Sequence, residues 1–135
     1  MERTLILVKP DAFARNLTGE IIARFERKGL VLVALALMTM TRELAASHYA
    51  EHEGKGFYDE LVGFITSGPL VAMALEGDHA VEAARQVIGA TNPLQASPGS
   101  IRGDYAIEVA QNMVHGSDSS QSAAREVALF FPDLA

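Results

Sequence analysis

The chain has 135 residues, a length typical of one domain that closes one sizeable core, and we expect residues 1–135 to form one domain. Its 17 acidic residues against 11 Lys and Arg give a formal net charge of -6, which argues against a nucleic acid or an anionic membrane as the main partner. The chain contains no cysteine, which excludes disulfides, thiolate metal sites and cysteine nucleophiles.

The first part of the chain alternates apolar segments with an amphipathic one. Residues 4–8 are aliphatic or β-branched and stop at Lys9-Pro10-Asp11, which predicts a buried strand closed by proline. Thr18 opens a helical pattern that Gly29 ends. Residues 30–41 predict a long second strand, buried on both faces or in a subunit contact. The apolar runs are too short for a membrane span or a signal-peptide core, so we expect a cytoplasmic protein.

Short helices and a third strand are predicted for the middle of the chain. Residues 42–53 and 57–67 have the pattern of two short helices separated by a glycine-containing turn. Residues 70–75 predict the third strand. Asp78 is a natural N-cap for a helix that runs from His79 to about Ile88.

The last third begins with a segment that has no regular pattern. Residues 89–103 are rich in glycine, proline and serine, and a loop of this length is uncommon unless it is functional. Residues 107–115 should contain the last strand, and Asp118 or Ser119 caps a helix to about Phe131. This element order best fits an α+β fold, the ferredoxin-like split βαβ sandwich, with a four-stranded, mainly antiparallel sheet and the helices packed on one face.

The segment 112–119 is the first candidate for chemistry. His115 is followed by Gly116 and hydroxyl side chains, so a ligand has room beside a ring that can change its charge near neutral pH. The alternative is a surface turn with a bystander histidine. Glu126 lies at the border of the apolar stripe of the last helix. It either reaches solvent or lies beneath the histidine, where it would fix one ring nitrogen as N–H and leave the other as a nucleophile or base.

Three cations stand near strand ends and around the long loop. Lys9, Arg85 and Arg102 would each, taken singly, be read as solvated surface charges. If they converge, their donors suit phosphate oxygens, and Thr91 and Asn112 could add neutral hydrogen bonds. The phosphate-binding loop GxxxxGK[ST] is absent, so any phosphate must be held in another way.

Aromatic and histidine side chains between residues 48 and 57 leave alternatives open. Phe57 either anchors the core or, if exposed, stacks on a base without discriminating among bases, and Tyr49 has a similar ambiguity. His48 and His52 have the i, i+4 spacing of zinc ligands, but the HExxH pattern is missing and no third ligand is evident. We interpret both as exposed helix histidines and predict no direct metal ligand. We expect any required ion to be Mg²⁺ carried on nucleotide phosphates.

Six motifs in order, over roughly residues 3 to 131, make the chain resemble the nucleoside diphosphate kinases, in particular the short bacterial form. They are Lys9-Pro10-Asp11, Gly19-Glu20-Ile21, Ser67-Gly68-Pro69, Gly89–Pro93, Pro98–Asp104 and Asn112–Ser119. Each motif alone is weak evidence, but their shared order makes chance an untenable explanation.

The resemblance implies an enzyme that moves the γ-phosphoryl group of a nucleoside triphosphate, typically ATP, to a nucleoside diphosphate by a ping-pong mechanism, with His115 as the phosphohistidine. It implies Mg²⁺ as cofactor, a role in maintaining nucleoside triphosphate pools, and a homo-oligomer, with a hexamer favoured and a tetramer possible. Ser117 and Glu126 would orient the histidine. The implied nucleotide contacts are Lys9 and Asn112 to the ribose, with Lys9 also near the transferred phosphate, Tyr49, Arg85, Thr91 and Arg102 to the phosphates, and Phe57 to the base.

The chain departs from the family pattern at a few positions. Ala12 stands where glycine is usual, Gly56 where proline commonly precedes the stacking phenylalanine, and Phe130 where tryptophan is common. Gly56 could loosen the base clamp, because glycine adds the backbone freedom that proline removes. The alternative function is a catalytically silent nucleotide-binding or regulatory module of the same fold, since fold alone does not fix function.

Overall fold

A computed structural model of the chain describes residues 1–50 and 53–134. Its centre is a four-stranded sheet in the order β2-β3-β1-β4, in which every neighbouring pair is antiparallel. The strands are β1 (Glu2–Val8), β2 (Val31–Met38), β3 (Leu70–Gly77) and β4 (Val114–Gly116). This order and pairing confirm the ferredoxin-like α+β fold expected from the sequence.

Seven α-helices and one short 3₁₀ helix lie between and after these strands in the part of the chain that the structure describes. They are α1 (Pro10–Ala14), α2 (Thr18–Lys28), α3 (Arg42–His48), α4 (Tyr58–Ile65), α5 (Ala80–Ile88), η2 (Pro93–Gln95), α6 (Ile101–Tyr105) and α7 (Ser120–Phe130). None of these helices is long and apolar enough to cross a membrane.

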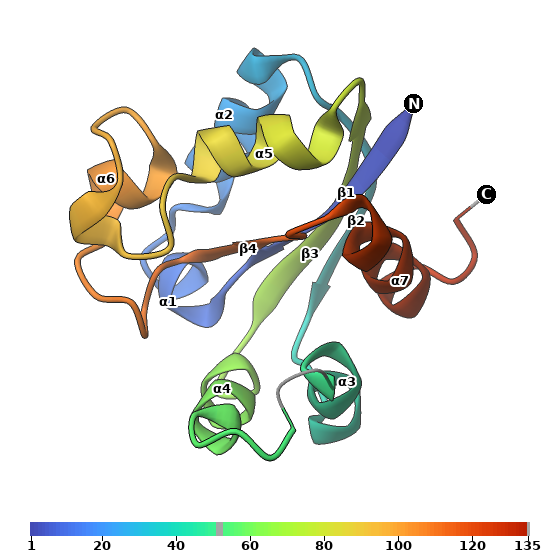
Figure 1. Cartoon of the computed structure of the whole chain (residues 1–135), viewed down its shortest axis with the longest axis vertical. Helices are drawn as coiled ribbons and strands as arrows, with labels where there is room; N and C mark the ends of the chain where they lie inside the picture. Colours follow the sequence, from blue (N-terminus) through green and yellow to red (C-terminus); the bar gives the residue numbers. More distant parts are fainter. Residues whose placement is uncertain (51–52, 135) are drawn as a thin grey trace.

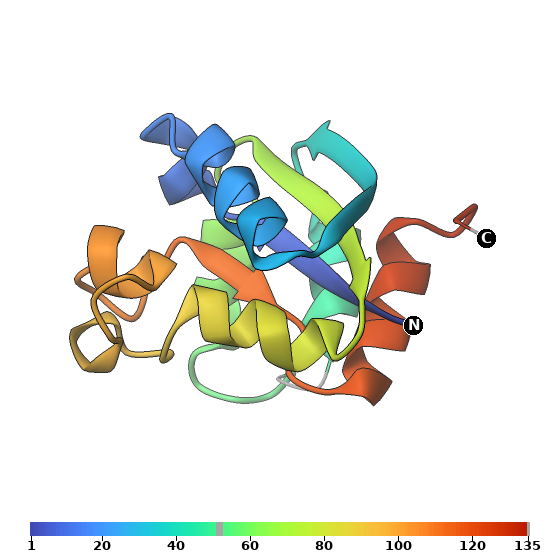
Figure 2. The same ribbon diagram turned by 90° about the horizontal axis from the view of Figure 1, so that it is seen from above.

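The helices cover both faces of the sheet, so the expectation that they lie on one face is wrong. Ile6 and Val8 of β1 pack with α2 and α5, whereas Leu5 and Leu7 pack with α3, α4 and α7. Figure 1 and Figure 2 show α2 and α5 on one side of the sheet, away from α3, α4 and α7. Because successive side chains of a strand alternate between faces, a central strand between two helix layers is apolar at every position.

The strand expected over residues 30–41 is β2, an edge strand rather than one buried on both faces. Val31, Leu35 and Leu37 are each more than half exposed in the chain taken by itself. The alternative explanation of its apolar length, a subunit contact, stays a prediction.

Two helix starts differ from the sequence-based expectation. His79, not Asp78, is the N-cap of α5; it has a left-handed φ of 55° and its side chain makes no capping hydrogen bond. The helix α1 was not expected from the sequence, because Pro10 was interpreted only as the residue that ends β1. Proline also suits the first turn of a helix, where its missing N–H has no intrahelical partner to lose.

The segment 89–103 is not all loop, and the last strand is shorter than expected. Ser100 caps α6 by accepting a hydrogen bond from the Gly103 N–H at 3.1 Å, which a composition-based reading does not reveal. Of residues 107–115, only 114 and 115 belong to β4. Met113 just before β4 is buried with a left-handed φ of 76°, and this turn ends the irregular stretch and starts the strand that carries His115.

Candidate active site

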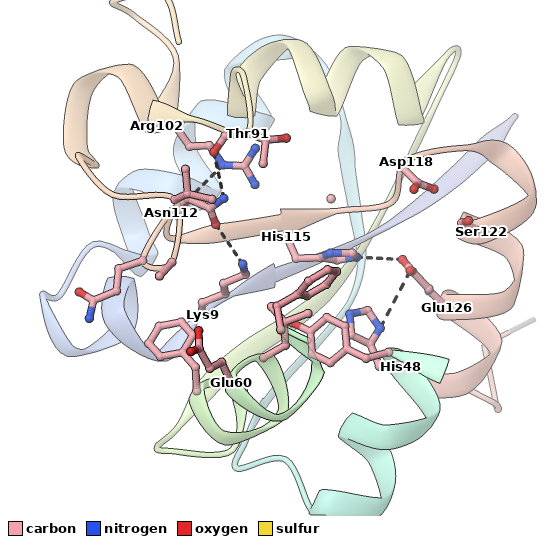
Figure 3. A pocket seen from close by; sticks show the side chains of 18 of the residues that line it. Lys9, His48, Glu60, Thr91, Arg102, Asn112, His115, Asp118, Ser122 and Glu126 are labelled. Atoms are coloured by element: carbon pink, nitrogen blue, oxygen red, sulfur yellow. Dashed lines mark hydrogen bonds and ion pairs between the residues drawn. The ribbon is translucent and has the colours of Figure 1, made fainter. Parts of the chain in front are cut away.

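One cavity of about 760 Å³ opens beside β4, between α4, α7 and the segments that precede β4 (Figure 3). It gathers nine of the ten residues singled out in the sequence, which are Lys9, Tyr49, Phe57, Arg85, Thr91, Arg102, Asn112, His115 and Glu126. The tenth, Ser117, does not line the cavity but hydrogen-bonds to Glu126. Residues spread over most of the chain therefore meet in one place.

The sheet positions His115. His115 pairs with Leu7 of the inner strand β1, so the hydrogen bonds of the sheet fix its backbone. Its side chain is 20% exposed and points to the cavity. The next residue is Gly116, where an added Cβ would lie 2.6 Å from the Cδ1 atom of Ile88. The absence of a side chain at Gly116 lets α5 approach β4 closely, and α5 carries Arg85.

A buried carboxylate orients the histidine ring. Nε2 of His115 lies 2.9 Å from Oε1 of Glu126, and the Ser117 hydroxyl donates to the same oxygen at 2.7 Å. Burial by itself favours the protonated carboxyl, but the hydrogen bond and electrostatic interaction with His115, together with the hydrogen bond from Ser117, outweigh it and lower the pKa of Glu126 to about 2. An ionised carboxylate only accepts, so Nε2 carries the proton and Nδ1 has a free lone pair.

The Ser117 hydroxyl also ties this pair to the sheet. It is fully buried and accepts a hydrogen bond from the Leu5 N–H at 3.1 Å, while the Ser117 N–H donates to the Leu5 carbonyl at 3.1 Å. The Glu126 carboxylate is thereby held in place by β1, one of the two inner strands of the sheet.

Lys9 follows β1 and reaches across the cavity toward the segment before β4. Its Nζ donates to Oδ1 of Asn112 at 3.0 Å, and Nδ2 of Asn112 donates to the Thr91 carbonyl at 3.1 Å (Figure 3). Burial and the neighbouring charge of Arg102 lower the pKa of Lys9 to about 8, although the carboxylate of Asp11 acts in the opposite direction. The ammonium group is thus cationic at neutral pH but close to losing its proton.

Arg102 is held by backbone carbonyls. Its Nε, Nη1 and Nη2 atoms donate to the carbonyls of Asn112, Gly89 and Val114 at 3.2, 3.1 and 2.6 Å. Each terminal nitrogen keeps a second N–H, so the guanidinium can brace the loop and still offer donors to the cavity that it lines. Arg85 approaches from α5, where its Nη1 donates to the Gly116 carbonyl at 3.2 Å.

The two aromatic candidates differ in exposure. Phe57 is 47% exposed at the cavity edge, and Nζ of Lys55 lies 6.0 Å from its ring centroid. Tyr49 is buried, and burial together with the negative charge of Glu126 raises the pKa of its hydroxyl to about 12. Its hydroxyl is therefore protonated and able to donate at neutral pH.

A family model described as nucleoside diphosphate kinase matches residues 2–135. The chain belongs to the nucleoside diphosphate kinase family. It is 63% identical over 134 residues to the nucleoside diphosphate kinase of Frankia casuarinae, covering 99% of this chain and 98% of the relative. It is 59% identical to that of Thermobifida fusca over the full length of both chains.

The solved structures agree with the sequence relatives. The chain superposes on a halophilic nucleoside diphosphate kinase from Halobacterium salinarum in complex with CDP with a TM-score of 0.95 and 51% identity, covering 98% of this chain and 88% of that one. Its function is accordingly that of the nucleoside diphosphate kinases, which are phosphotransferases acting on nucleotides.

Sequence reasoning missed one histidine of this kinase cavity. His48, expected to be exposed, is only 4% exposed, and its ring meets that of His115 edge-on with centroids 4.6 Å apart. The other half of the pair considered for zinc, His52, lies outside the described residues. The spacing of His48 from Leu44 and Ala45, four and three residues earlier, was a signal that it faces the core. Arg125 was also missed; it lines the cavity and donates to the carbonyls of Ser47 and His48.

Proposed function

We propose that His115 carries the γ-phosphoryl group between a nucleoside triphosphate and a nucleoside diphosphate, with residues 1–135 acting as one kinase domain. The observation that carries this proposal is the chain of contacts from Ser117 through Glu126 to His115, which ends in a cavity lined by Lys9 and two arginines. This arrangement places a nucleophile beside positively charged side chains that can bind phosphate oxygens.

Nδ1 of His115 is the proposed attacking atom. Its lone pair forms a bond to the γ-phosphorus as the bond from phosphorus to the bridging oxygen breaks, and the nucleoside diphosphate leaves with that electron pair. The ring becomes an imidazolium with its proton still on Nε2, next to the carboxylate of Glu126 at 2.9 Å. The second half-reaction reverses these steps on another diphosphate, which gives ping-pong kinetics and restores the neutral ring.

In our proposal, each of the remaining cavity residues contacts one part of the nucleotide. Lys9 and Asn112 bind the ribose hydroxyls, with Lys9 also near the transferred phosphate, and Phe57 stacks on the base. The phosphate contacts come from Tyr49, Arg85, Thr91 and Arg102. The Halobacterium salinarum kinase was solved in complex with CDP, which supports a nucleoside diphosphate in the corresponding cavity of this chain. Stacking on a phenylalanine face does not select among bases, so we propose broad base tolerance.

We propose Mg²⁺ as the cofactor, brought in on the nucleotide phosphates. Asp118 and Glu60 line the cavity, and their carboxylate oxygens are the ligand type that Mg²⁺ prefers, directly or through water. When bound, the ion neutralises phosphate charge during transfer. Nε2 of His115 and Oε1 of Glu126 are hydrogen-bonded to each other, and we do not include them among the proposed Mg²⁺ ligands.

A homo-oligomer is also proposed, with a hexamer favoured over a tetramer. The exposed side chains of Val31, Leu35 and Leu37 on the edge strand β2 support an assembled state, because contiguous exposed apolar surface commonly marks an interface. The mass of the protein in solution, measured by light scattering, tests this; a monomer at micromolar concentration would contradict it.

The decisive experiment is incubation with γ-labelled ATP and Mg²⁺, followed by an acid-lability test on the protein. We expect one acid-labile phosphoryl group per chain, discharged by an added nucleoside diphosphate. His115→Ala should not be labelled but should still bind nucleotide. An unlabelled wild-type protein that binds nucleotide would favour the catalytically silent binding module instead.

A further inference from the structure

His48 is a buried polar side chain that the proposed phosphoryl transfer does not use. It is the last residue of α3, and neither of its ring nitrogens has a hydrogen-bond partner among the described residues. Buried polar atoms without partners are uncommon, and each one calls for an explanation such as a redox role, a catalytic role or an ion. This ring lines the same cavity as His115.

The unpartnered ring faces two other metal-ligating side chains. Nδ1 of His48 lies 4.0 Å from Oε2 of Glu126, and Nε2 of His115 lies 2.9 Å from Oε1 of the same carboxylate (Figure 3). One ligand atom from each of the three residues lies within 4.8 Å of the others. In a tetrahedral zinc site, with bonds of about 2.0–2.2 Å, ligand atoms are about 3.3–3.6 Å apart, so modest side-chain shifts would bring the three together.

The donor set selects a class of metal. Two imidazoles and one carboxylate are a set that zinc uses when it keeps a fourth position open for water or another ligand, and here the fourth position would face the cavity. Mg²⁺ prefers oxygen ligands in octahedral geometry, so the ion carried on a nucleotide would not compete for this set. Ions later in the first-row series bind such nitrogen-rich sets more tightly than Mn²⁺ does.

We propose that His48, His115 and Glu126 form an inhibitory site for a zinc-class divalent cation. The metal site itself stands on these three side chains, and only its inhibitory consequence rests on the proposed function. A metal on Nε2 of His115 needs the lone pair of that nitrogen, so the single proton of the neutral ring moves from Nε2 to Nδ1. Nδ1 then has no lone pair for attack on phosphorus, and phosphoenzyme formation stops without any block of nucleotide binding.

Two cations near the cluster set the strength of the site. Nη2 of Arg125 lies 3.7 Å from Oε2 of Glu126, and Lys9 lines the same cavity. Both repel a divalent ion, so the cluster should bind zinc reversibly, as a regulator or inhibitor would, and release it to a chelator. It is not expected to be a structural site that the fold requires.

The test is calorimetric titration of Zn²⁺ into tag-free, full-length protein, alongside His48→Gln and a control variant, His79→Asn. The control removes an exposed histidine outside this cavity, and asparagine tolerates the left-handed backbone at that position. We expect one zinc per chain with equal affinity in wild type and His79→Asn, and binding at least tenfold weaker in His48→Gln. Equal affinity in all three proteins would overturn the proposal.

Two further readouts keep the test independent of how His48→Gln folds. Co²⁺ in place of Zn²⁺ should give the intense visible absorption of tetrahedral cobalt in wild type, and His115→Asn should lose it; a weak octahedral spectrum in wild type would contradict the site. With excess Mg²⁺ and labelled ATP, zinc should suppress phosphoenzyme formation and a chelator should restore it. If no phosphoenzyme forms even without zinc, the proposed function fails while calorimetry still decides the metal site.

Discussion

The Nε2 atom of His115 lies 2.9 Å from Oε1 of Glu126, so the proton of the ring is held on the side away from the proposed phosphate. The carboxylate is buried, and its pKa of about 2 keeps it ionised at neutral pH. Orientation and tautomer of the nucleophile are thus set by one contact. The contact is supported in turn by Ser117, which is fixed to β1 through its bonds with Leu5.

Replacement of that carboxylate by an amide should slow the first half-reaction. In Glu126→Gln the side chain can turn either its oxygen or its NH₂ group toward His115, so the ring tautomer is no longer enforced and the imidazolium loses its counter-charge. We expect phosphoenzyme formation about 10- to 100-fold slower, the usual cost of removing an orienting partner of a functional histidine. Rapid quench with labelled ATP measures this, and Glu43→Gln on exposed α3 surface is the control. Wild-type rates in Glu126→Gln would refute the orienting role.

The position of Glu126 was accessible from sequence because helical periodicity is local. Ala123, Val127 and Phe130 form the apolar stripe of α7, and the geometry of this one helix places Glu126 beside that stripe. The left-handed Gly29 at the end of α2 was predictable for the same reason. Strand and helix order then limited the fold to very few arrangements.

The features that could not be predicted depend on contacts between distant segments. Arg102 donates hydrogen bonds to the carbonyls of residues 89, 112 and 114, and no local sequence pattern predicts these partners. The covering of both sheet faces depends on how α7 returns to β1 from the end of the chain. Helical spacing indicates that His48 faces the core, but its contacts with His115 and Glu126 could not be predicted, because these residues come from other elements.

Nucleotide binding should be coupled to protonation of Lys9. Its pKa of about 8 lies below the ordinary lysine value because the charged form is buried near Arg102, so the free protein loses this charge as the pH rises through 8. A bound phosphate favours the ammonium form, and binding near pH 8 should therefore take up about half a proton. Calorimetry in buffers of different ionisation enthalpy measures the uptake. Lys9→Arg, always charged, should show none, and equal uptake in both proteins would contradict the assignment.

The lowered pKa of Lys9 also determines how this residue makes the free energy of unfolding change with pH. Between pH 8 and about 10 the folded protein binds fewer protons at Lys9 than the unfolded chain does, so this residue makes the free energy of unfolding rise with pH in that window. Below pH 8 both states are protonated and the contribution of Lys9 to the pH dependence disappears. Chemical denaturation of wild type and Lys9→Gln at several pH values should show a smaller rise for the variant, and identical slopes would contradict the shifted pKa.

Two glycine-to-alanine changes should have opposite effects. At Gly103 an added Cβ would lie 2.1 Å from the Ser97 carbonyl oxygen, so the backbone that carries Arg102 must move. We expect Gly103→Ala to destabilise by about 1–3 kcal/mol, the range for overpacking, and to weaken nucleotide binding. Gly63 lies within α4 with nothing within 4 Å of the added atom, so Gly63→Ala should stabilise by about 0.5–1 kcal/mol. Denaturant midpoints measure both, and loss of stability in both variants would show that space at the Cβ does not decide the outcome.

The pairing of Arg24 with the α6 segment should matter for the cavity although Arg24 does not line it. Its guanidinium forms ion pairs with Glu20 at 2.9 Å and Asp104 at 2.7 Å and donates to the Gly99 carbonyl at 3.1 Å. These contacts hold the segment that presents Arg102, so Arg24→Gln should raise the dissociation constant of a nucleoside diphosphate by roughly three- to tenfold, equivalent to about 0.6–1.4 kcal/mol.

Arg3 offers a matched control for this prediction. It also pairs with a glutamate, Glu76, at 2.8 Å, and its side chain is likewise only partly exposed, but its partner belongs to β3 and not to the segment that presents Arg102. Arg3→Gln should lower stability slightly through its lost surface ion pair and leave nucleotide affinity unchanged. Arg24→Lys should recover part of the affinity, because it keeps the charge near Asp104 but not the forked donors. Equal dissociation constants for Arg24→Gln and Arg3→Gln would mean that the α6 segment holds Arg102 without help from α2.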